Sequence, residues 1–309
     1  MPTVLRIDSF RLILSSILAL LTVGMAPASA DLTRLAMRDA ADYSTNRRGC
    51  SLLVVQHGKI LLEEYTNGGD PRKKTITLRD LMNFSDGLDP GFHLHSDKVP
   101  DRNALALRTP TVAPRGAAFT YGPSHGQVLC EVLRRKLAAH GETPFGYLQH
   151  KLLNPLGMGA VPYRADAQGM PLVASGIRLT ARQWSRFGLL LLGRGTYERR
   201  LLVEPKGLAQ CFNGTRVNPM FGLGFWLNTG ANHGDARESD IEDLLEKKWQ
   251  DQDWHNRCIC RSAPTDLIAV VGSGYQRLFV IPSLDLVIVR QGTNARFSDA
   301  EFLRKILRR

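Results

Sequence analysis

The sequence has 309 residues, of which 43% are hydrophobic and 22% are charged, as in an ordinary globular protein. Its formal net charge is +11 and its isoelectric point is near 9.7, but the arginines are spread along the chain without a nucleic-acid motif. We therefore interpret the charge as a generally basic surface and expect no nucleic-acid partner.

The first thirty residues predict a secretory signal peptide. Arg6 and Arg11 flank the start of an apolar run at Leu12–Val23, and Ala28-Ser29-Ala30 follows the run. The run is too short for a comfortable transmembrane helix. We expect cleavage after Ala30, a single domain at residues 31–309, a periplasmic or secreted location and no integral membrane span.

The N-terminal third predicts a helix, a hairpin and a second, short helix. An initial helix lies within 31–49, and apolar runs at 52–56 and 59–65 flank a His57-Gly58 turn. Thr77, three residues before Asp80, is the expected cap of the short helix. Residues 89–116 have few periodic apolar positions and predict an irregular surface excursion.

The segment 119–158 predicts two helices. Ser124 and Gln127 have the spacing of a capping box, and Thr143-Pro144 opens a second helix that ends near Asn154-Pro155. Tyr121 would then lie just before a helix N-terminus, where partial positive charge favours a phenolate. It is a candidate general base, and the alternative is a tyrosine that only packs its ring.

The C-terminal half predicts a helix, a polar segment, three strands and a last helix. Thr180 and Gln183 have capping-box spacing, whereas residues 228–263 form either an insertion or a short exposed helix around 241–249. The expected strands are 267–271, 277–281 and 286–290, and Ser298 with Glu301 caps the final helix.

The sequence has five cysteines, and their spacing does not predict a complete metal site. An odd number leaves at least one of them unpaired within the chain. Cys258 and Cys260 lie near His255, but no second cluster completes a set of four ligands. We predict neither a metal nor a cofactor.

Several blocks, in order, resemble the serine β-lactamase-related family of class C β-lactamases, DD-peptidases and esterases. Besides Tyr121 and the Leu-x-x-Pro-Leu-Gly-Met turn at 152–158, the similar blocks are 76–88 (ITLRDLMNFSDGL), 174–191 (ASGIRLTARQWSRFGLLL), 221–226 (FGLGFW) and 276–289. The predicted hairpin, helices, terminal strand pair and final helix together suggest an α+β fold. The resemblance makes this specific, because it implies a central antiparallel sheet that joins the N- and C-terminal strands and is flanked by helices. A catalytic cleft would lie between the sheet and a helical region.

One family feature is missing. Such proteins act through Ser-x-x-Lys, yet no lysine in this sequence has a serine three residues before it. The chain passes from Tyr65 to Ile76 through only ten residues, where relatives carry a much longer segment. The resemblance therefore implies an internal truncation, between about 65 and 76, that removes the nucleophile and part of the helical region.

By the same resemblance, Tyr121 matches the motif tyrosine, and Pro123 replaces the usual asparagine. The third family motif would fall near 268–274, where no lysine or histidine is present. Gly272 and Gly274 are candidate substrate-binding residues there, although they could simply bend a strand.

A rival pattern is Gly122-Pro123-Ser124-His125-Gly126, formally the G-x-S-x-G elbow of an esterase. Ser124 would attack, assisted by Asp166 and by His233 or His255. Against this, 117–121 is a poor strand, and helix capping explains Ser124 without catalysis.

The sequence thus leaves two classes open. One is an exported serine hydrolase by descent, impaired or inactive, whose ligands would be β-lactams, peptidoglycan stem peptides or small amides and esters. The other is a non-catalytic binding module or a degraded gene product.

Overall fold

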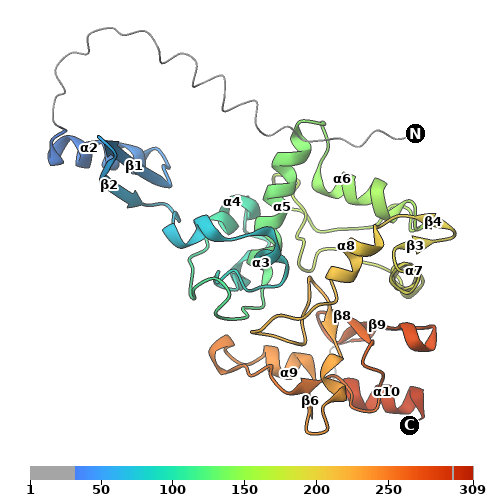
Figure 1. Ribbon diagram of the computed structural model, residues 1–309. Coiled ribbons are helices and arrows are strands. Elements are labelled where there is room, and N and C mark those ends of the chain that lie inside the picture. Colours follow the sequence, from blue (N-terminus) through green and yellow to red (C-terminus); the bar gives the residue numbers. More distant parts are fainter. Residues whose placement is uncertain (1–31, 294–295, 309) are drawn as a thin grey trace.

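The computed structural model describes residues 32–293 and 296–308, so the predicted signal peptide lies outside the described residues. Helices and strands form an N-terminal lobe at residues 32–65 and a larger body (Figure 1). The body consists of a helical half and a sheet half. Among the described residues, no helix is both long and apolar enough to cross a bilayer.

The N-terminal lobe has the predicted helix and hairpin. Helix α2 (Arg34–Asn46) begins after Thr33, whose side chain accepts a backbone hydrogen bond of the first turn. Strand β1 (Ser51–Gln56) pairs antiparallel with β2 (Lys59–Tyr65). His57 and Gly58 in the turn have φ of 49° and 75°, the left-handed geometry that suits a two-residue hairpin loop.

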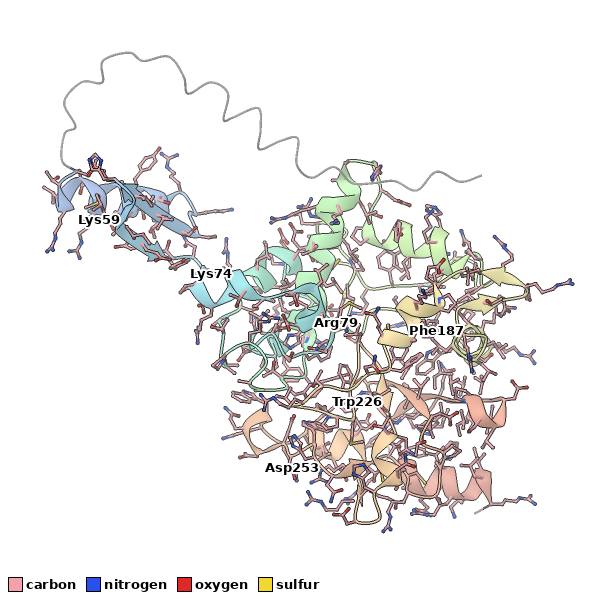
Figure 2. All side chains as sticks on the ribbon, in the orientation of Figure 1. Lys59, Lys74, Arg79, Phe187, Trp226 and Asp253 are labelled. Atoms are coloured by element: carbon pink, nitrogen blue, oxygen red, sulfur yellow. The ribbon has the colours of Figure 1, made fainter. Side chains whose placement is uncertain are left out.

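This hairpin is not part of the main sheet. The strands of that sheet have the order β10 (Leu286–Arg290), β9 (Gln276–Ile281), β8 (Ile268–Gly272) and β5 (Trp226–Leu227). The expectation that the first and last strands share one sheet is therefore wrong for this chain. The cause is the short connection 66–75, which is anchored to the helical half. Arg72 Nη2 donates to the Thr111 carbonyl at 3.0 Å, and Lys73 Nζ donates to the Leu107 carbonyl at 3.1 Å. Lys74 lies at this junction, whereas Lys59 lies out on the lobe (Figure 2).

The helical half follows the connection. Helix α3 begins with the predicted capping box of Thr77 and Asp80, and α6 begins at the predicted Thr143-Pro144. The elements are η1 (Pro71–Thr75), α3 (Leu78–Met82), η2 (Phe92–His95), α4 (Arg102–Leu107), α5 (Pro123–Ala138), α6 (Pro144–Leu148) and the π-helical turn η3 (Gln149–Leu153).

Two local predictions need correction here. The excursion at 89–116 is not wholly irregular, because it contains α4, whose first turn is capped by Asp101. Helix α5 has Gly122 at its N-cap and makes no side-chain cap, so the capping box of Ser124 and Gln127 does not form. Both side chains bind distant partners; Gln127 Nε2, for example, donates to Asn103 Oδ1 at 2.6 Å.

The sheet half is a four-stranded antiparallel sheet between two helices. Its strands are β5 (Trp226–Leu227), β8 (Ile268–Gly272), β9 (Gln276–Ile281) and β10 (Leu286–Arg290), and its covering helices are α7 (Ala181–Leu192) and α10 (Asp299–Leu307). Side chains alternate along β9, so Leu278 and Val280 pack with α7 while Phe279 and Ile281 pack with α10. A Cβ on Gly188 of α7 would lie 2.6 Å from Val287, so this close helix–sheet contact requires glycine.

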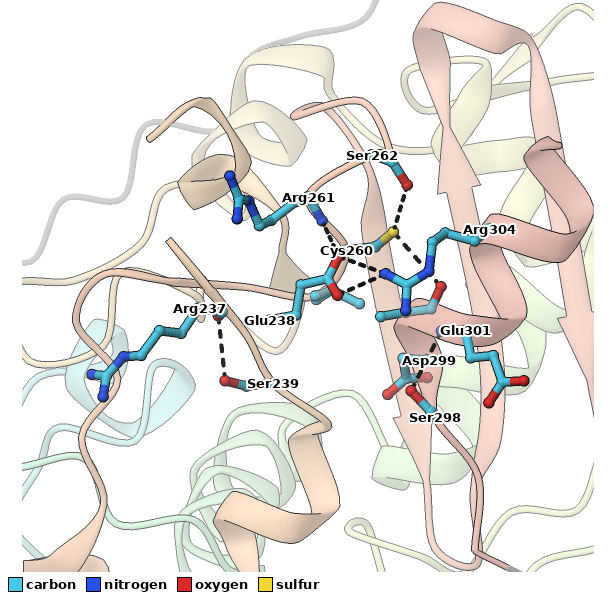
Figure 3. Close-up of polar contacts among 12 residues, drawn as sticks. Arg237, Glu238, Ser239, Cys260, Arg261, Ser262, Ser298, Asp299, Glu301 and Arg304 are labelled. Atoms are coloured by element: carbon cyan, nitrogen blue, oxygen red, sulfur yellow. Dashed lines mark hydrogen bonds and ion pairs between the residues drawn. The ribbon is translucent and has the colours of Figure 1, made fainter. Parts of the chain in front are cut away.

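Residues 228–263 belong to the core of this half and are not an exposed insertion. Helix α9 (Ile241–Leu245) buries Ile241 and Leu244, and Trp254 is buried in the same cluster. Figure 3 shows how the segment is tied to α10: Glu238 accepts from Arg304 at 2.7 and 2.9 Å and from the Arg261 amide at 2.8 Å. The polar residues of the segment form such surface contacts, whereas apolar residues such as Ile241, Leu244 and Trp254 are buried in the core.

The remaining elements are short. They are β3 (Thr196–Tyr197), β4 (Arg200–Leu201), α8 (Pro205–Gln210), η4 (Thr229–Asn232), β6 (Arg237–Glu238), η5 (Trp249–Asp251), β7 (Arg257–Cys258) and η6 (Pro282–Leu284).

Candidate functional site

A cavity of about 470 Å³ lies where the helical half meets the sheet half. The loop before α5 contributes Tyr121, and the end of β8 with its following turn contributes Gly272 and Gly274. The remaining lining is Phe84, Phe92, His95, Gly122, Pro123, Ala174, Ser175, Glu242, Leu245, Glu246, Val271, Ser273 and Tyr275. Three of the four candidate site residues thus share one cavity, while Ser124 does not line it.

The Tyr121 ring is held by aromatic neighbours. Its centroid lies 5.4 Å from that of Phe84 and 6.0 Å from that of Trp226. Among the described residues, no hydrogen bond to the Tyr121 hydroxyl is formed. The chain fixes the ring while leaving its hydroxyl available to a molecule in the cavity.

The protonation state of Tyr121 differs from the sequence-based expectation. Burial raises the pKa of Tyr121 above its ordinary value of 10.0, and the nearby Glu242 carboxylate adds to the rise. These effects outweigh the positive charge of Arg277, which favours a phenolate. Tyr121 is therefore a neutral phenol near pH 7, and it can donate a hydrogen bond but is a poor general base.

The two glycines differ in what they allow. A Cβ on Gly272 would lie 2.9 Å from the Cβ of Gln276, its cross-strand partner, so sheet pairing alone explains this glycine. Gly274 has a φ of 74°, and a Cβ there would meet only the Gln276 side chain at 3.7 Å. The turn therefore leaves open space beside Gly274, and the substrate-binding role of both residues stays a prediction.

One wall of the cavity is acidic. Glu242 accepts from the Tyr275 amide at 2.9 Å and forms an ion pair with the fully buried Arg277. Arg277 also binds Asp299 at 2.7 Å, so a single guanidinium is shared by two carboxylates. Glu246 lies further along the same wall and is exposed. These side chains give the wall a net negative charge.

Ser124 does not have the surroundings of an esterase nucleophile. It is fully buried at the start of α5, and its Oγ donates to the Asp89 carbonyl at 2.6 Å. The proposed partners are engaged elsewhere: Asp166 accepts from the Arg102 amide at 2.8 Å, and His255 Nε2 lies 2.9 Å from the Arg216 carbonyl. His233 is exposed and, in the described residues, makes no side-chain hydrogen bond with Ser124.

Sequence reasoning missed a buried pair beside the cavity. His125 Nδ1 lies 2.6 Å from Asp86 Oδ2, and both side chains are fully buried. The imidazole stacks on Phe84 at 4.7 Å, and its Nε2 has no partner in the described part of the chain. The pair ties the start of α5 to the segment after α3. The only sequence signals were that Asp86 lies in the 76–88 block and His125 in the Gly122–Gly126 pattern.

Burial also shifts the pKa of His95, which lines the cavity, and that of Cys258, which does not. Burial lowers the pKa of His95, with Arg164 and Arg102 adding to the effect, so its imidazole is neutral near pH 7. Burial raises the pKa of the Cys258 thiol to about 11, and Cys260 is also buried. Among the described residues, no group of three or more His, Cys, Asp or Glu side chains is placed to hold a metal ion.

Comparison with known proteins identifies the fold. No family model matches the chain, and no curated protein does. A solved structure of a candidate β-lactamase from Bacteroides dorei matches with a TM-score of 0.52 at 15% identity, over 89% of this chain and 98% of that one. A candidate 6-aminohexanoate-dimer hydrolase from Bacillus anthracis matches with a TM-score of 0.54 at 14% identity, over 87% of this chain and 80% of that one.

These likenesses confirm the predicted α+β class and the likeness in fold to β-lactamase-related proteins. The chain has the fold of the β-lactamase-like serine hydrolases, and the cavity at Tyr121 lies between its sheet and its helices.

Proposed function

We propose, from this fold and this cavity, that the chain is an exported relative of the serine hydrolases that binds an amide or ester ligand without hydrolysing it. One observation carries the proposal: Tyr121 lines an open cavity, yet no lysine in the sequence follows a serine by three residues. Acyl transfer needs a nucleophile activated by an adjacent base. The signal-like segment at 1–30 supports export.

The other hydroxyls near the cavity support the same conclusion. Ser175 and Ser273 line it, but neither is hydrogen-bonded to a histidine or a lysine in the part of the chain that the structure describes. His95 also lines the cavity, and its buried Nε2 has no partner there. An unassisted serine is a weak nucleophile at neutral pH, so we expect binding without turnover.

The polar groups of the cavity favour a particular ligand. The neutral Tyr121 phenol can donate to a carbonyl oxygen, whereas Glu242 and Glu246 favour a positive charge. An amide that also carries a protonated amine offers both. Peptidoglycan stem peptides and linear amino-acid amides have this combination, and we infer that the natural ligand belongs to this class.

Calorimetric titration tests the proposal. The probes are a stem peptide and the linear dimer of 6-aminohexanoate, each with its N-acetylated form as control. We expect the free amines to bind more tightly than the acetylated forms, and mass spectrometry to recover every probe uncleaved. A fluorescent penicillin should leave no covalent adduct. Cleavage of a probe, or a stable acyl adduct, would show that the chain is an active hydrolase.

Glu246→Gln provides a matched variant, because Glu246 is exposed and its loss should leave the fold unchanged. We expect it to reduce the preference for free amines over acetylated probes by a factor of about 2 to 5, the size of a partly screened charge contact. The control is Glu198→Gln, which removes an exposed carboxylate in the β3–β4 turn that does not line the cavity. If both variants and the parent chain preferred free amines over acetylated probes equally, the acidic wall would not bind the amine.

A further inference from the structure

The N-terminal lobe presents an apolar surface that nothing in the described chain covers. Leu53, Val55 and Ile60 are 56%, 52% and 60% exposed. They share one face of the hairpin, because Leu53 and Val55 are two residues apart on β1 and Val55 pairs with Ile60 on β2. These three large apolar side chains lie side by side and form an exposed apolar patch on the hairpin.

The main sheet has an open edge at β10. One edge of β10 pairs with β9, and no other strand of the described residues pairs with its second edge. All five β10 side chains are half-buried, with Val287 and Val289 toward α7 and Leu286 and Ile288 toward α10. An apolar strand with unpaired amides and carbonyls is a template for another strand.

The covering helices also carry exposed apolar side chains. Leu189 on α7 and Ile306 on α10 are 44% and 41% exposed. These helices pack on opposite faces of the sheet that ends at β10. A strand added at the β10 edge would therefore extend a sheet that already has α7 on one face and α10 on the other.

Within one chain the hairpin and this edge are kept apart. Asp70, Arg72 and Lys73 tie the connection to the segment 107–111, so only residues 66–69 remain between the hairpin and the first anchor. Four extended residues span roughly 14 Å at most. Figure 1 shows the hairpin and the C-terminal sheet on opposite sides of the molecule.

We propose that the β1–β2 hairpin of one copy of this chain pairs with the open β10 edge of a second copy. The exchange is reciprocal, because each copy has one free hairpin and one free edge, and so it closes as a two-fold dimer. Pairing would satisfy the free groups of β10 and remove Leu53, Val55 and Ile60 from water.

The mass in solution tests the dimer. Light scattering on the full chain, with a reducing agent present so that exposed Cys50 forms no disulfide, should give twice the mass of one chain. The double variant Leu53→Lys and Val55→Lys should return the mass to that of a single chain. Leu201→Lys, at an equally exposed position on β4, is the matched control and should remain dimeric.

Hydrogen exchange on the unmodified chain gives a second measurement that needs no variant. Amides of β10 that face away from β9 should exchange more slowly as the concentration rises, whereas those of the β3–β4 turn should not change. A monomer at every concentration would overturn the proposal. So would a dimer that persists in the double lysine variant, or β10 exchange that is independent of concentration.

Discussion

At the scale of single residues, aromatic neighbours hold the ring of Tyr121 in place at the cavity. The same neighbours half-bury the side chain, and burial disfavours the charged form of a phenol. The Tyr121 hydroxyl therefore stays protonated and can donate a hydrogen bond. Its contribution to binding should be that of one hydrogen bond.

Tyr121→Phe should weaken binding of an amide probe by roughly 2- to 10-fold, the equivalent of about 0.5–1.5 kcal/mol for a neutral hydrogen bond. The melting temperature should not fall, because the ring contacts stay. Since the pKa is raised above 10.0, the Tyr121 contribution should be constant from neutral pH up to that value and be lost only above it. Calorimetric titration checks the affinity and its pH dependence, and thermal denaturation checks the melting temperature. Tyr147→Phe, which alters an exposed ring on α6, is the control.

The buried Asp86–His125 pair also acts at this scale. Asp86 accepts from the Leu88 amide at 2.7 Å as well as binding His125, so one carboxylate fixes a turn and a helix start. Removing it leaves two buried donors without a partner.

Asp86→Ala should lower the free energy of unfolding by about 3 kcal/mol, because unpaired buried polar groups keep their full desolvation cost. Urea denaturation followed by circular dichroism measures the change. Asp251→Ala, at an exposed position, should cost less than about 0.5 kcal/mol. Similar losses in the two variants would show that the pair contributes little.

At the scale of elements, the Glu131 carboxylate on α5 binds two arginines of the same helix and Asn103 of α4. Glu131 accepts from Arg134 at 2.7 and 2.8 Å, from Arg135 at 2.7 Å and from Asn103 at 3.1 Å. Hydrogen bonds from Arg134 lower the pKa of Glu131 from 4.5 to about 2, and those from Arg135 and Asn103 add to the effect.

A lowered pKa in the folded state means that the ionised form is stabilised by folding. The contribution of Glu131 is therefore complete above pH 4.5 and is lost as the pH falls toward about 2. Urea midpoints measured across this range should fall more steeply for the parent chain than for Glu131→Gln. Parallel curves for the two proteins would contradict the assignment.

Elements also differ in how they begin. The starts of α3 and α7 follow their capping boxes, because a cap depends only on side chains three residues apart. The start of α5 does not, because Pro123 occupies its first turn and tertiary partners take the side chains of Ser124 and Gln127. A local rule fails where distant groups offer the same side chain a better partner.

At the scale of the whole molecule, one hydrophobic cluster joins the two halves of the body. It includes Phe119 before α5, Ile241 on α9, Phe279 on β9 and Leu303 on α10. Segment 228–263 therefore holds the cavity walls together, although its composition is that of a surface loop.

Ile241→Ala should reduce the free energy of unfolding by about 2–5 kcal/mol, the cost of a cavity at a fully buried position. Leu201→Ala, at an exposed position, should change it little. Thermal and urea denaturation measure both. If Ile241→Ala behaved like Leu201→Ala, segment 228–263 would be peripheral to the fold.

The sequence by itself determined most helices and strands, the α+β class and the loop position of Tyr121, because these follow from periodicity, caps and turns within a few residues. Only the tertiary structure decided where the hairpin lies, that α9 is part of the core, and that the pKa of Tyr121 is raised. Each of these depends on contacts between groups far apart in the chain: the anchored connection at 66–75, the cluster around Ile241, and the burial of the phenol beside Glu242. Such contacts leave no periodic trace in a sequence.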